Sequence, residues 1–360
     1  MRVILDCDPG IDDTYAIIFL TAAAHGGLIE LDCLTTTSGN APADQCAQNG
    51  AWILGQCGLP IISLAAGLPE PLEVELTTTP ETHGDTGLGY AQAPERHVEH
   101  DWDALWIDSI ERGTDDLHLI VTGPLTNLAA FAHAHPQHFA KLKHITVMGG
   151  AVNYPGNTTP SAEWNFWVDP HAAADVFAMT PAPITLCSLG VTEQMLLSPE
   201  ALAEFVDKLG GSPLAEYLEA ITRFYFEFHQ SVGVGYCAQI HDLGLDALLR
   251  QLLGGGECET DHAAVGGDGD VLAFTTDLGL ADRQNVVLDL GHVELQPVHH
   301  LVLEEDDRVR VADRGLQQTL GVGRAIGLHD LEAGDRGIPG RVVLGMLGGH
   351  AGGGAVRATE

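Results

Sequence analysis

The sequence predicts an α/β fold with a mainly parallel central sheet and helices on both faces, an open Rossmann-like architecture. Apolar strand-like runs alternate with helix-like segments through the first half of the chain. The helical connections are long enough for right-handed crossovers between parallel strands. Polar residues gather directly after several of the expected strands. Because ligands bind outside the carboxyl ends of the strands in such sheets, we expect the functional site there.

The expected elements follow one another from the N-terminus. Strands are expected at residues 3–5, 29–36, 61–65, 118–121, 144–148 and 184–187. Helices are expected at residues 12–25, 43–56, 102–112, 124–134 and 170–178, the fourth with a proline in its first turn. Residues 198–236 are helical in pattern and predict two helices outside the sheet.

The pattern weakens beyond residue 254, where glycine clusters separate short strand-like pieces at 286–290 and 309–312. The sequence has no internal repeat and no clear linker. We therefore expect one domain over residues 1–360, with an uncertain C-terminal quarter.

The charge balance limits the possible partners. The 360 residues include 50 acidic and 16 basic side chains, which gives a net charge of −34. Nucleic acid and anionic membranes bind clustered Lys and Arg, so neither is an expected partner. No stretch of about 18 uncharged apolar residues predicts a membrane span. Our hypothesis is a halophilic, lysine-poor surface adapted to high internal salt, where screening removes the self-repulsion.

The cysteine pattern indicates a cellular compartment. Seven cysteines include no C-x-x-C pair, and the N-terminus lacks the basic and apolar regions of a secretory signal. We expect a reduced, cytoplasmic protein with small buried thiols. No P-loop or G-x-G-x-x-G stretch occurs, so ATP and NAD are not implied.

Four carboxylates lie within eight residues between the first strand and the first helix: Asp6, Asp8, Asp12 and Asp13. The intervening Pro9-Gly10 pair forces a tight turn, so the acids converge. Such a cluster is costly without a cation, and oxygen ligands favour a hard ion such as Ca²⁺ or Mg²⁺. Helix capping is the alternative explanation, but it accounts for only one or two of the four acids.

The motif D-x-D-P-G-x-D-D resembles the most specific signature of the nucleoside hydrolases, the inosine–uridine preferring type and its relatives. Further motifs follow in the order of that family: residues 36–40, 83–89, 122–127, 148–150, 163–165 with Asn157, 169–170 and 241–242. The resemblance covers residues 1–246, whereas residues 247–360 match poorly. It implies hydrolysis of the N-glycosidic bond of ribonucleosides, in purine or pyrimidine salvage, by a homodimer or homotetramer.

The resemblance also implies a calcium site. Asp8, a bidentate Asp13 and Asp242 would be the carboxylate ligands, and Thr122 would add its backbone carbonyl. The 2′- and 3′-hydroxyls of the substrate and a water would complete a shell of about eight oxygens. The resemblance makes Asp8 the general base that activates the calcium-bound water.

Ribose contacts are implied at five positions. Asp12 and Asn40 would contact the 2′-hydroxyl or the attacking water, and Asn157, Glu163 and Asn165 would reach the 5′- and 3′-hydroxyls. Oxygens around the sugar stabilise an oxocarbenium-like transition state, so Asn165 is also an expected catalytic residue. For Asn157 the alternative is ordinary turn chemistry in its Pro-Gly-Asn-Thr context.

The remaining expected residues would meet the nucleobase. His241 would protonate the departing base, a role that suits a side chain titrating near neutral pH. His83 would contact the base or order a flap, and Met148 is expected to bind substrate. Tyr225 and His229 share one face of an expected helix by their i, i+4 spacing. Core packing is an equal alternative for Tyr225, and His229 replaces a tyrosine of some purine-accepting members.

Two other functions remain open from the sequence. The D-x-D motif after a first strand also resembles haloacid-dehalogenase-type phosphohydrolases, but that chemistry requires Mg²⁺ and a downstream lysine, and the chain has only three lysines. A non-enzymatic ribose- or nucleoside-binding protein would use the same ligand set.

Overall fold

The computed structural model describes residues 1–180 and 182–243, together with the backbone of five two-residue strands beyond them. A seven-stranded sheet has the order β11-β6-β5-β4-β1-β2-β3. Its six leading strands pair in parallel, whereas β11 (Leu288–Asp289) is antiparallel to β6. The parallel strands are β1 (Arg2–Cys7), β2 (Glu30–Thr36), β3 (Ser63–Ala66), β4 (Leu117–Val121), β5 (His144–Met148) and β6 (Ile184–Cys187). The predicted α/β class with a mainly parallel sheet is confirmed.

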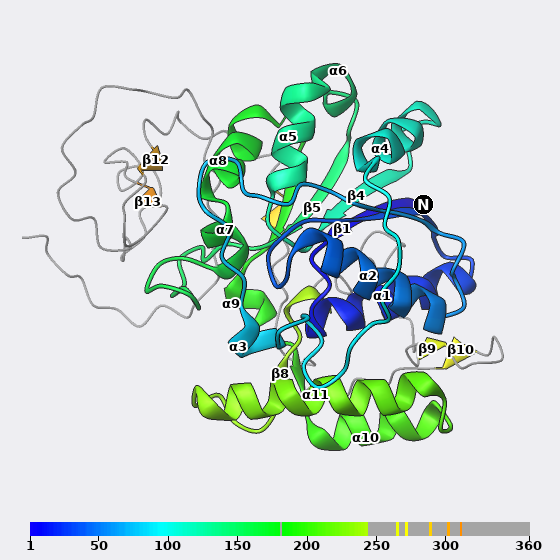
Figure 1. Cartoon of the computed structure of the whole chain (residues 1–360). Helices are drawn as coiled ribbons and strands as arrows, with labels where there is room; N and C mark the ends of the chain where they lie inside the picture. The colour runs from blue at the N-terminus through cyan, green and yellow to red at the C-terminus, as the bar shows by residue number, and fades with distance from the viewer. Residues whose placement is uncertain are drawn as a thin grey trace, which may run out of the picture.

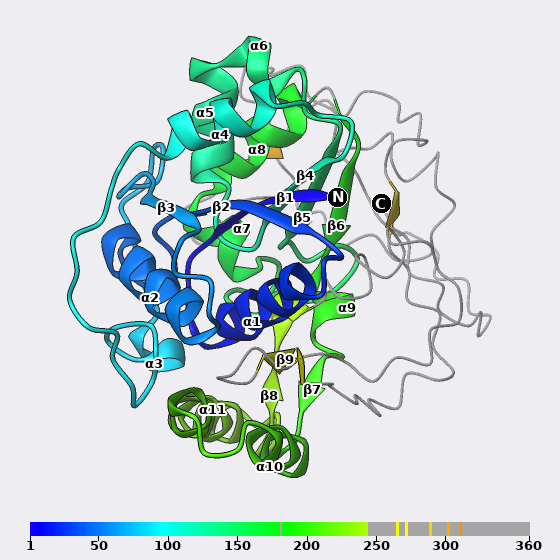
Figure 2. The same ribbon diagram turned by 90° about the vertical axis from the view of Figure 1, so that its right-hand side faces the viewer.

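Helices cover both faces of this sheet (Figures 1 and 2). One face carries α1 (Ile11–His25) and α2 (Ala43–Gln56), and the other carries α4 (Trp102–Glu111), α5 (Thr126–Ala134) and α8 (Pro170–Met179). Four short helices fill the connections: α3 (Pro80–His83), α6 (Pro136–Phe139), α7 (Trp164–Val168) and α9 (Leu189–Thr192). Since these are one turn or little more, hydrophobic periodicity did not predict them.

Two hydrophobic cores lie on opposite faces of the sheet, and β1 contributes to both. Val3 and Leu5 belong to the core shared with α1 and α2, whereas Ile4 belongs to the core shared with α4, α5 and α8. Side chains alternate between the faces of a strand, so three consecutive apolar residues fill both cores. This double burial holds β1, and the loop that follows it, in the middle of the molecule.

A third helical layer lies outside the α/β body, below it in Figure 1. It consists of α10 (Pro199–Lys208) and α11 (Pro213–Ser231), and it confirms the two helices predicted outside the sheet. Leu202, Phe205, Leu218 and Ile221 are buried in the core on the α1 side. The short pair β7 (Leu196–Leu197) and β8 (Ala238–Gln239) leads the chain into and out of this layer, and the 3-10 helix η1 (His241–Leu243) follows.

Some predicted boundaries were wrong. The third strand begins at Ser63 rather than residue 61, because Ile61 is 88% exposed before the strand enters the core. The helix predicted at 124–134 begins at Thr126, so Pro124 precedes it and does not occupy its first turn. Pro124 packs instead against Gly39, where an added Cβ would lie 2.8 Å from its Cδ.

Beyond η1 the described pieces are short. The pairs β9 (Ala264–Val265) with β10 (Val271–Leu272) and β12 (Leu301–Val302) with β13 (Arg310–Val311) are antiparallel. β11 and β13 lie within the two strand-like pieces expected at 286–290 and 309–312. The other residues of the predicted C-terminal quarter, 247–360, lie outside the described part of the chain.

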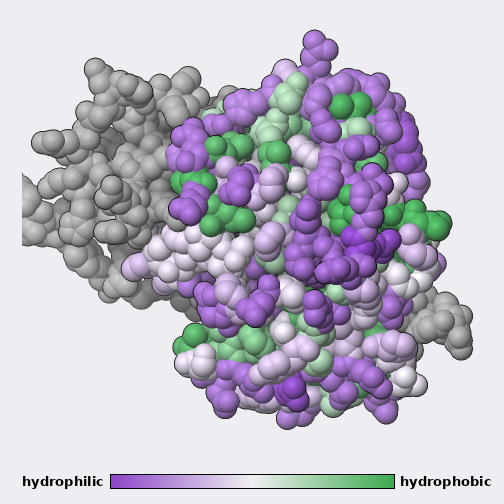
Figure 3. Space-filling view, in the orientation of Figure 1, coloured by the Kyte–Doolittle hydropathy of each residue, from purple (hydrophilic) through white to green (hydrophobic). Residues whose placement is uncertain are grey.

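The visible surface is mostly hydrophilic, with scattered hydrophobic patches (Figure 3). Among the described residues, no helix has the length and apolar character that crossing a membrane requires. The cysteines in this part of the chain are free thiols, and all but Cys237 are buried.

Candidate active site

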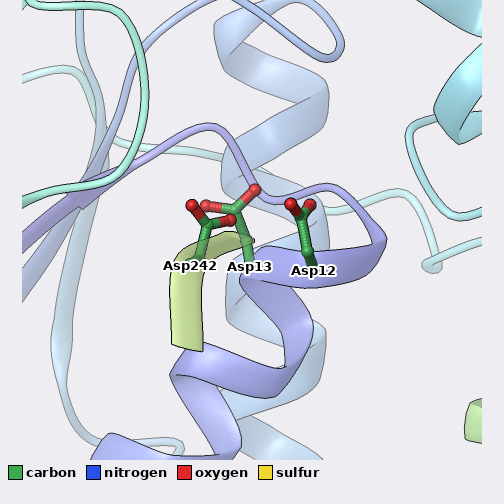
Figure 4. A group of neighbouring side chains, drawn as sticks. All are labelled: Asp12, Asp13 and Asp242. Carbon is green, nitrogen blue, oxygen red and sulfur yellow. The ribbon is translucent and has the colours of Figure 1, made fainter. Parts of the chain in front are cut away.

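Three carboxylates from opposite ends of the described chain meet at the carboxyl end of β1. Asp12 and Asp13 lie in the first turn of α1, and Asp242 lies in η1. One oxygen of each lies within 4.8 Å of the others, and all three side chains are buried. Figure 4 shows the three side chains, with Asp242 next to Asp13 and Asp12 to one side. The trio thus contains two of the three carboxylates expected as ligands from the sequence, Asp13 and Asp242.

Asp8 lies beside this trio, directly after β1, and is 1% exposed. Its Oδ2 accepts the backbone N–H of Asn40 at 2.7 Å. Two glycines fit around its carboxylate: a Cβ at Gly39 would collide with Oδ2, and one at Gly123 would lie 2.7 Å from Oδ1. Asp12 therefore takes the place in the close trio that the sequence analysis gave to Asp8, because Asp8 is held by its own loop contacts.

Asp13 is oriented by three segments of chain. Its Oδ2 accepts the N–H of Gly10 at 3.0 Å and the side-chain amide of Asn40 at 3.2 Å, and its Oδ1 accepts the hydroxyl of Thr122 at 2.9 Å. The bond to Gly10 is the capping contact considered from the sequence. Asp12, in the same turn, leaves one buried oxygen, Oδ1, without a hydrogen-bond partner.

The protein does not compensate the charge of these acids. Burial and the neighbouring carboxylates raise the pKa of Asp8 and of Asp242 well above the usual range, and burial also raises that of Asp13. The same causes raise the pKa of Asp12 to about 8. In the described chain, the only basic group within 4.0 Å of these acids is His83, and burial lowers its pKa to about 3. Oxygen donors with an unpartnered atom and no protein cation fit a hard divalent ion.

Glu163 and Asn165 lie at the start of α7, next to the ends of β4 and β5. Glu163 caps the helix, and its carboxylate accepts the N–H groups of Asn165, Phe166 and Gly150 at 2.8–3.1 Å. The Asn165 amide donates to the Thr122 carbonyl at 2.6 Å and lies 3.4 Å from the Met148 carbonyl and sulfur. Asn165 thus contacts three other expected site residues, Glu163, Thr122 and Met148. Glu163 also caps α7, a role that the sequence did not indicate.

Asn157 is exposed, on the loop that precedes α7. Its side-chain oxygen accepts the backbone N–H of Trp164 at 3.0 Å and the hydroxyl of Thr158 at 3.2 Å. These contacts are the turn chemistry considered as the alternative, and they place Asn157 next to the start of α7.

The rings of His83, Tyr225 and His229 pack together beside the acids, on the α11 side. The Tyr225 ring centroid is 5.2 Å from that of His83 and 4.4 Å from that of His229. His83 Nδ1 accepts the N–H of Ile11 at 3.1 Å, and its Nε2 lies 4.0 Å from Asp12. His229 donates from Nδ1 to the Tyr225 carbonyl at 2.8 Å and accepts the Gln239 N–H at Nε2. Its ring nitrogens thus have backbone partners and hold β8 against α11.

His241 precedes Asp242 in η1 and is held by Thr192, whose hydroxyl lies 3.0 Å from its Nδ1. Burial and the nearby His229 lower the pKa of His241 to about 3. The imidazole is therefore neutral at pH 7, with one N–H to donate. The sequence gave no signal for Thr192, which lies at the end of α9, far from His241 in the chain.

Asp6, one of the four clustered acids, lies within β1, and the sequence did not predict its partners. Asp6 is fully buried, and its Oδ1 accepts the Thr35 hydroxyl at 2.7 Å and the Asn127 amide at 2.9 Å. Asn127 also binds the Thr36 carbonyl at 3.0 Å and the Leu68 N–H at 2.9 Å. The motif at 122–127 included Asn127, but nothing in its spacing identified the partner.

Comparisons with known proteins identify the family of this chain. The family model of the inosine-uridine preferring nucleoside hydrolases matches residues 3–293. The pyrimidine-specific ribonucleoside hydrolase RihA of Shewanella baltica is 35% identical over 245 residues, which cover 67% of this chain and 75% of that protein. The corresponding protein of Shewanella woodyi is 36% identical over 248 residues, 67% and 76% of the two chains.

Solved structures show the same similarity. The purine-preferring ribonucleoside hydrolase from Gardnerella vaginalis superposes with a TM-score of 0.63 at 28% identity, over 70% of this chain and 81% of that one. A plant nucleoside hydrolase gives a TM-score of 0.62 at 28% identity, over 70% and 79%. From the match to residues 3–293 and these relatives, the chain belongs to the inosine-uridine preferring nucleoside hydrolase family.

Proposed function

We propose that this hydrolase cleaves the N-glycosidic bond of ribonucleosides with the help of a bound Ca²⁺ ion. Family membership supports the ribonucleoside hydrolase activity. The observation that carries the proposal is the meeting of Asp12, Asp13 and Asp242 beside Asp8, with oxygen ligands and no protein cation among them. Such a donor set favours a hard cation over a soft one.

Asp8, Asp13, Asp242 and the Thr122 carbonyl are the proposed ligands, with Asp12 beside them. When bound, the ion would supply a grip on the 2′- and 3′-hydroxyls and a lowered pKa for a water. A cation there would also favour the ionised carboxylates, whose pKa values burial raises.

Asp8 is the proposed general base. The Asn40 N–H and the adjacent glycines fix its carboxylate, so it can accept a proton from the attacking water without reorienting. Asn165 supports the same region through the Thr122 carbonyl, and Asp12 and Asn40 are the proposed contacts to a ribose hydroxyl or to the attacking water. Negative oxygens around the sugar stabilise a developing oxocarbenium ion.

The residues around the departing base are His241, His83, Met148, Tyr225 and His229. His241 is the proposed proton donor to the base, and Thr192 orients its ring. Since its lowered pKa leaves the ring neutral at pH 7, the ring would have to take up a proton before it passes one to the base. Tyr225 and His83 offer ring faces to a nucleobase, whereas His229 contributes its ring edge, because its nitrogens bind the backbone. Asn157 and Glu163 remain proposed ribose contacts.

The wider proposals follow the sequence analysis. We propose a cytoplasmic, salt-adapted homodimer or homotetramer that acts in nucleoside salvage. A phosphohydrolase would need a lysine at the acids, but Lys141 and Lys143 pair with Glu111 and Asp115 on the surface, and Lys208 ends α10. If the activity test finds no turnover, a non-enzymatic nucleoside-binding protein remains as the alternative function.

The test is to incubate the protein with inosine, uridine, cytidine and adenosine in high salt, with Ca²⁺ or chelator, and to follow free ribose. We expect release that stops without Ca²⁺. Asp8→Asn should lose most of the rate and still bind ribose, whereas Asp242→Ala should lose the ion. Asp115→Asn, a change on the 93% exposed side chain, is the control. Ribose release that chelator leaves unchanged would refute the calcium proposal.

A matched test concerns the leaving group. His241→Ala should slow natural nucleosides far more than a riboside whose leaving group departs without a proton, such as nitrophenyl riboside. Equal slowing of both substrates would contradict the proton-donor role of His241.

A further inference from the structure

Residues 83–90 form a closed loop whose two ends touch. The N–H of Gly89 donates to the His83 carbonyl at 2.7 Å, and a Cβ at Gly84 would lie 2.9 Å from the Gly89 Cα. Gly84 has φ 79°, a left-handed conformation that glycine adopts without strain. This closure brings the residue before Tyr90 into contact with His83.

The inner end of the loop lies at the acids. His83 accepts the N–H of Ile11, the first residue of α1, and its ring packs 5.2 Å from Tyr225. The body of the loop is tied to α2, since the Asn49 amide donates to the Thr86 carbonyl at 2.8 Å. The position of His83 therefore depends on how this loop is held.

The outer end of the loop is fastened to the solvent side of α11. Tyr90 is 52% exposed, and its hydroxyl donates to the Glu227 carboxylate. Its ring meets Phe224 edge-on with a centroid separation of 5.1 Å, and the Arg223 guanidinium lies 4.6 Å from the ring centroid. Three residues of one helix thus hold a single, half-exposed tyrosine through a hydrogen bond, an aromatic contact and a cation–π contact.

The same helix reaches the acids from its buried side. Tyr225, next to Phe224, is 2% exposed, and burial together with the charge of Asp12 raises the pKa of its hydroxyl. The loop and α11 therefore contact each other twice: inside through His83 and Tyr225, and outside through Tyr90. Between the two contacts Gly89 lies so close to α11 that an added Cβ would be 2.6 Å from the Phe224 Cβ.

We propose that Tyr90 is a positioning residue for substrate binding, which latches the 83–90 loop to α11 and so holds His83 and Tyr225 against the nucleobase. This inference rests on the proposed function. Tyr90 is too far out to touch substrate itself, because it lies on the solvent side of α11 and the acids lie on the buried side. Its effect passes through the closed loop to His83.

The kinetic test compares variants of both latch partners. Tyr90→Ala should raise KM about tenfold and change kcat by less than about twofold, since the latch orients binding groups and leaves the acids in place. Tyr90→Phe keeps the ring contacts and should show a smaller rise in KM, and Glu227→Gln keeps an acceptor and should stay near wild type. Tyr236→Ala, which removes a 43% exposed tyrosine packed on Phe226, is the matched control.

Hydrogen exchange provides a readout that does not need turnover. In the Ca²⁺-supplemented protein, backbone amides of residues 84–90 should exchange about tenfold faster in Tyr90→Ala than in wild type or Tyr236→Ala. If wild type hydrolyses no nucleoside but exchange rises in this way, the proposed function fails and the latch stands. Unchanged exchange in Tyr90→Ala overturns the latch, whatever the kinetics show.

Discussion

The carboxylate of Asp8 lies against the Cα of Gly39, at a place where no side chain fits. Oδ2 lies 2.1 Å from the position that a Cβ of Gly39 would take, and the next residue, Asn40, donates its N–H to the same oxygen. The Thr-Thr-Ser-Gly-Asn segment after β2 is thus shaped to hold the proposed base. Glycine is required here for close approach rather than for an unusual φ angle.

Gly39→Ala should therefore displace Asp8 and lower kcat/KM about 100-fold, since a shift of about 1 Å in a reacting group has effects of this size. Gly55→Ala is the matched control: Gly55 lies in α2 with nothing within 4 Å of an added Cβ. That control should keep full activity and gain about 0.5–1 kcal/mol of stability from its better helix propensity. Wild-type kinetics in Gly39→Ala would show that Asp8 needs no such fit.

Asp12 predicts how pH affects the stability of the metal-free protein. Burial and Asp13 raise its folded pKa to about 8, above the unfolded value, so its contribution to stability is full below about pH 4. That contribution is lost as pH rises through about 8. In chelator, the free energy of unfolding of wild type should fall relative to Asp12→Asn over this range by a few kcal/mol.

The measurement is urea unfolding at a series of pH values in constant high salt. Calcium should reduce the difference between wild type and Asp12→Asn at high pH, because a bound cation stabilises the ionised acid. A difference that does not depend on pH in chelator would contradict the assignment of a raised pKa to Asp12.

Asn165 donates to the Thr122 carbonyl, so a negative charge on residue 165 should repel that carbonyl oxygen. Asn165→Asp would set a carboxylate oxygen against that carbonyl and add a further acid to the site. We expect kcat/KM to fall about 100-fold or more, and further than in Asn165→Ala, which only removes the donor. Steady-state kinetics on the two variants decide this, and an Asp variant as active as the Ala variant would exclude repulsion.

His118 predicts a second, opposite pH effect far from the acids, at the amino ends of β4 and β5. Its ring stacks on His144 with centroids 4.4 Å apart, and burial together with His144 lowers its pKa to about 4. A lowered histidine pKa means that stability is lost as pH falls from about 6.5 towards 4. Between pH 7 and 5 this loss should be about 2 kcal/mol or less.

His118→Phe keeps a ring in the stack and should remove that loss in the same unfolding measurement. His97→Phe, at a side chain that is 84% exposed, is the control and should behave as wild type. Parallel pH curves for wild type and His118→Phe would assign the acid sensitivity to other groups.

The parts of the fold that sequence could predict are those where pattern and packing coincide. Val3, Ile4 and Leu5 read as a buried strand, and the two cores require an unbroken apolar run there. The turn at Pro9-Gly10 indicated that the nearby acids converge, and the carboxyl end of β1 is where they lie. Local chemistry and overall topology were consistent in this half of the chain.

The sequence could not predict which side-chain atoms of the site would face one another. The spacing of Asp8, Asp12 and Asp13 leaves open which of them approaches Asp242, and that depends on Asn40 and Gly39 from another strand end. His229 was expected to bind substrate from its position on α11, yet its nitrogens are bound to backbone groups, one of them in β8. Glu163 caps α7, and the sequence did not predict this cap because α7 is too short to give a periodic signal.

The acid trio joins the first turn of α1 to η1, which lie near the two ends of the described residues 1–180 and 182–243. No fragment that lacks either segment can assemble these carboxylates, so the proposed ion binding would report that η1 has docked on α1. A nascent chain would acquire it only after residues up to Asp242 have been synthesised and have folded against the first turn of α1. Ion-dependent resistance to proteolysis could then serve as an assay that separates fully folded molecules from compact, unfinished ones.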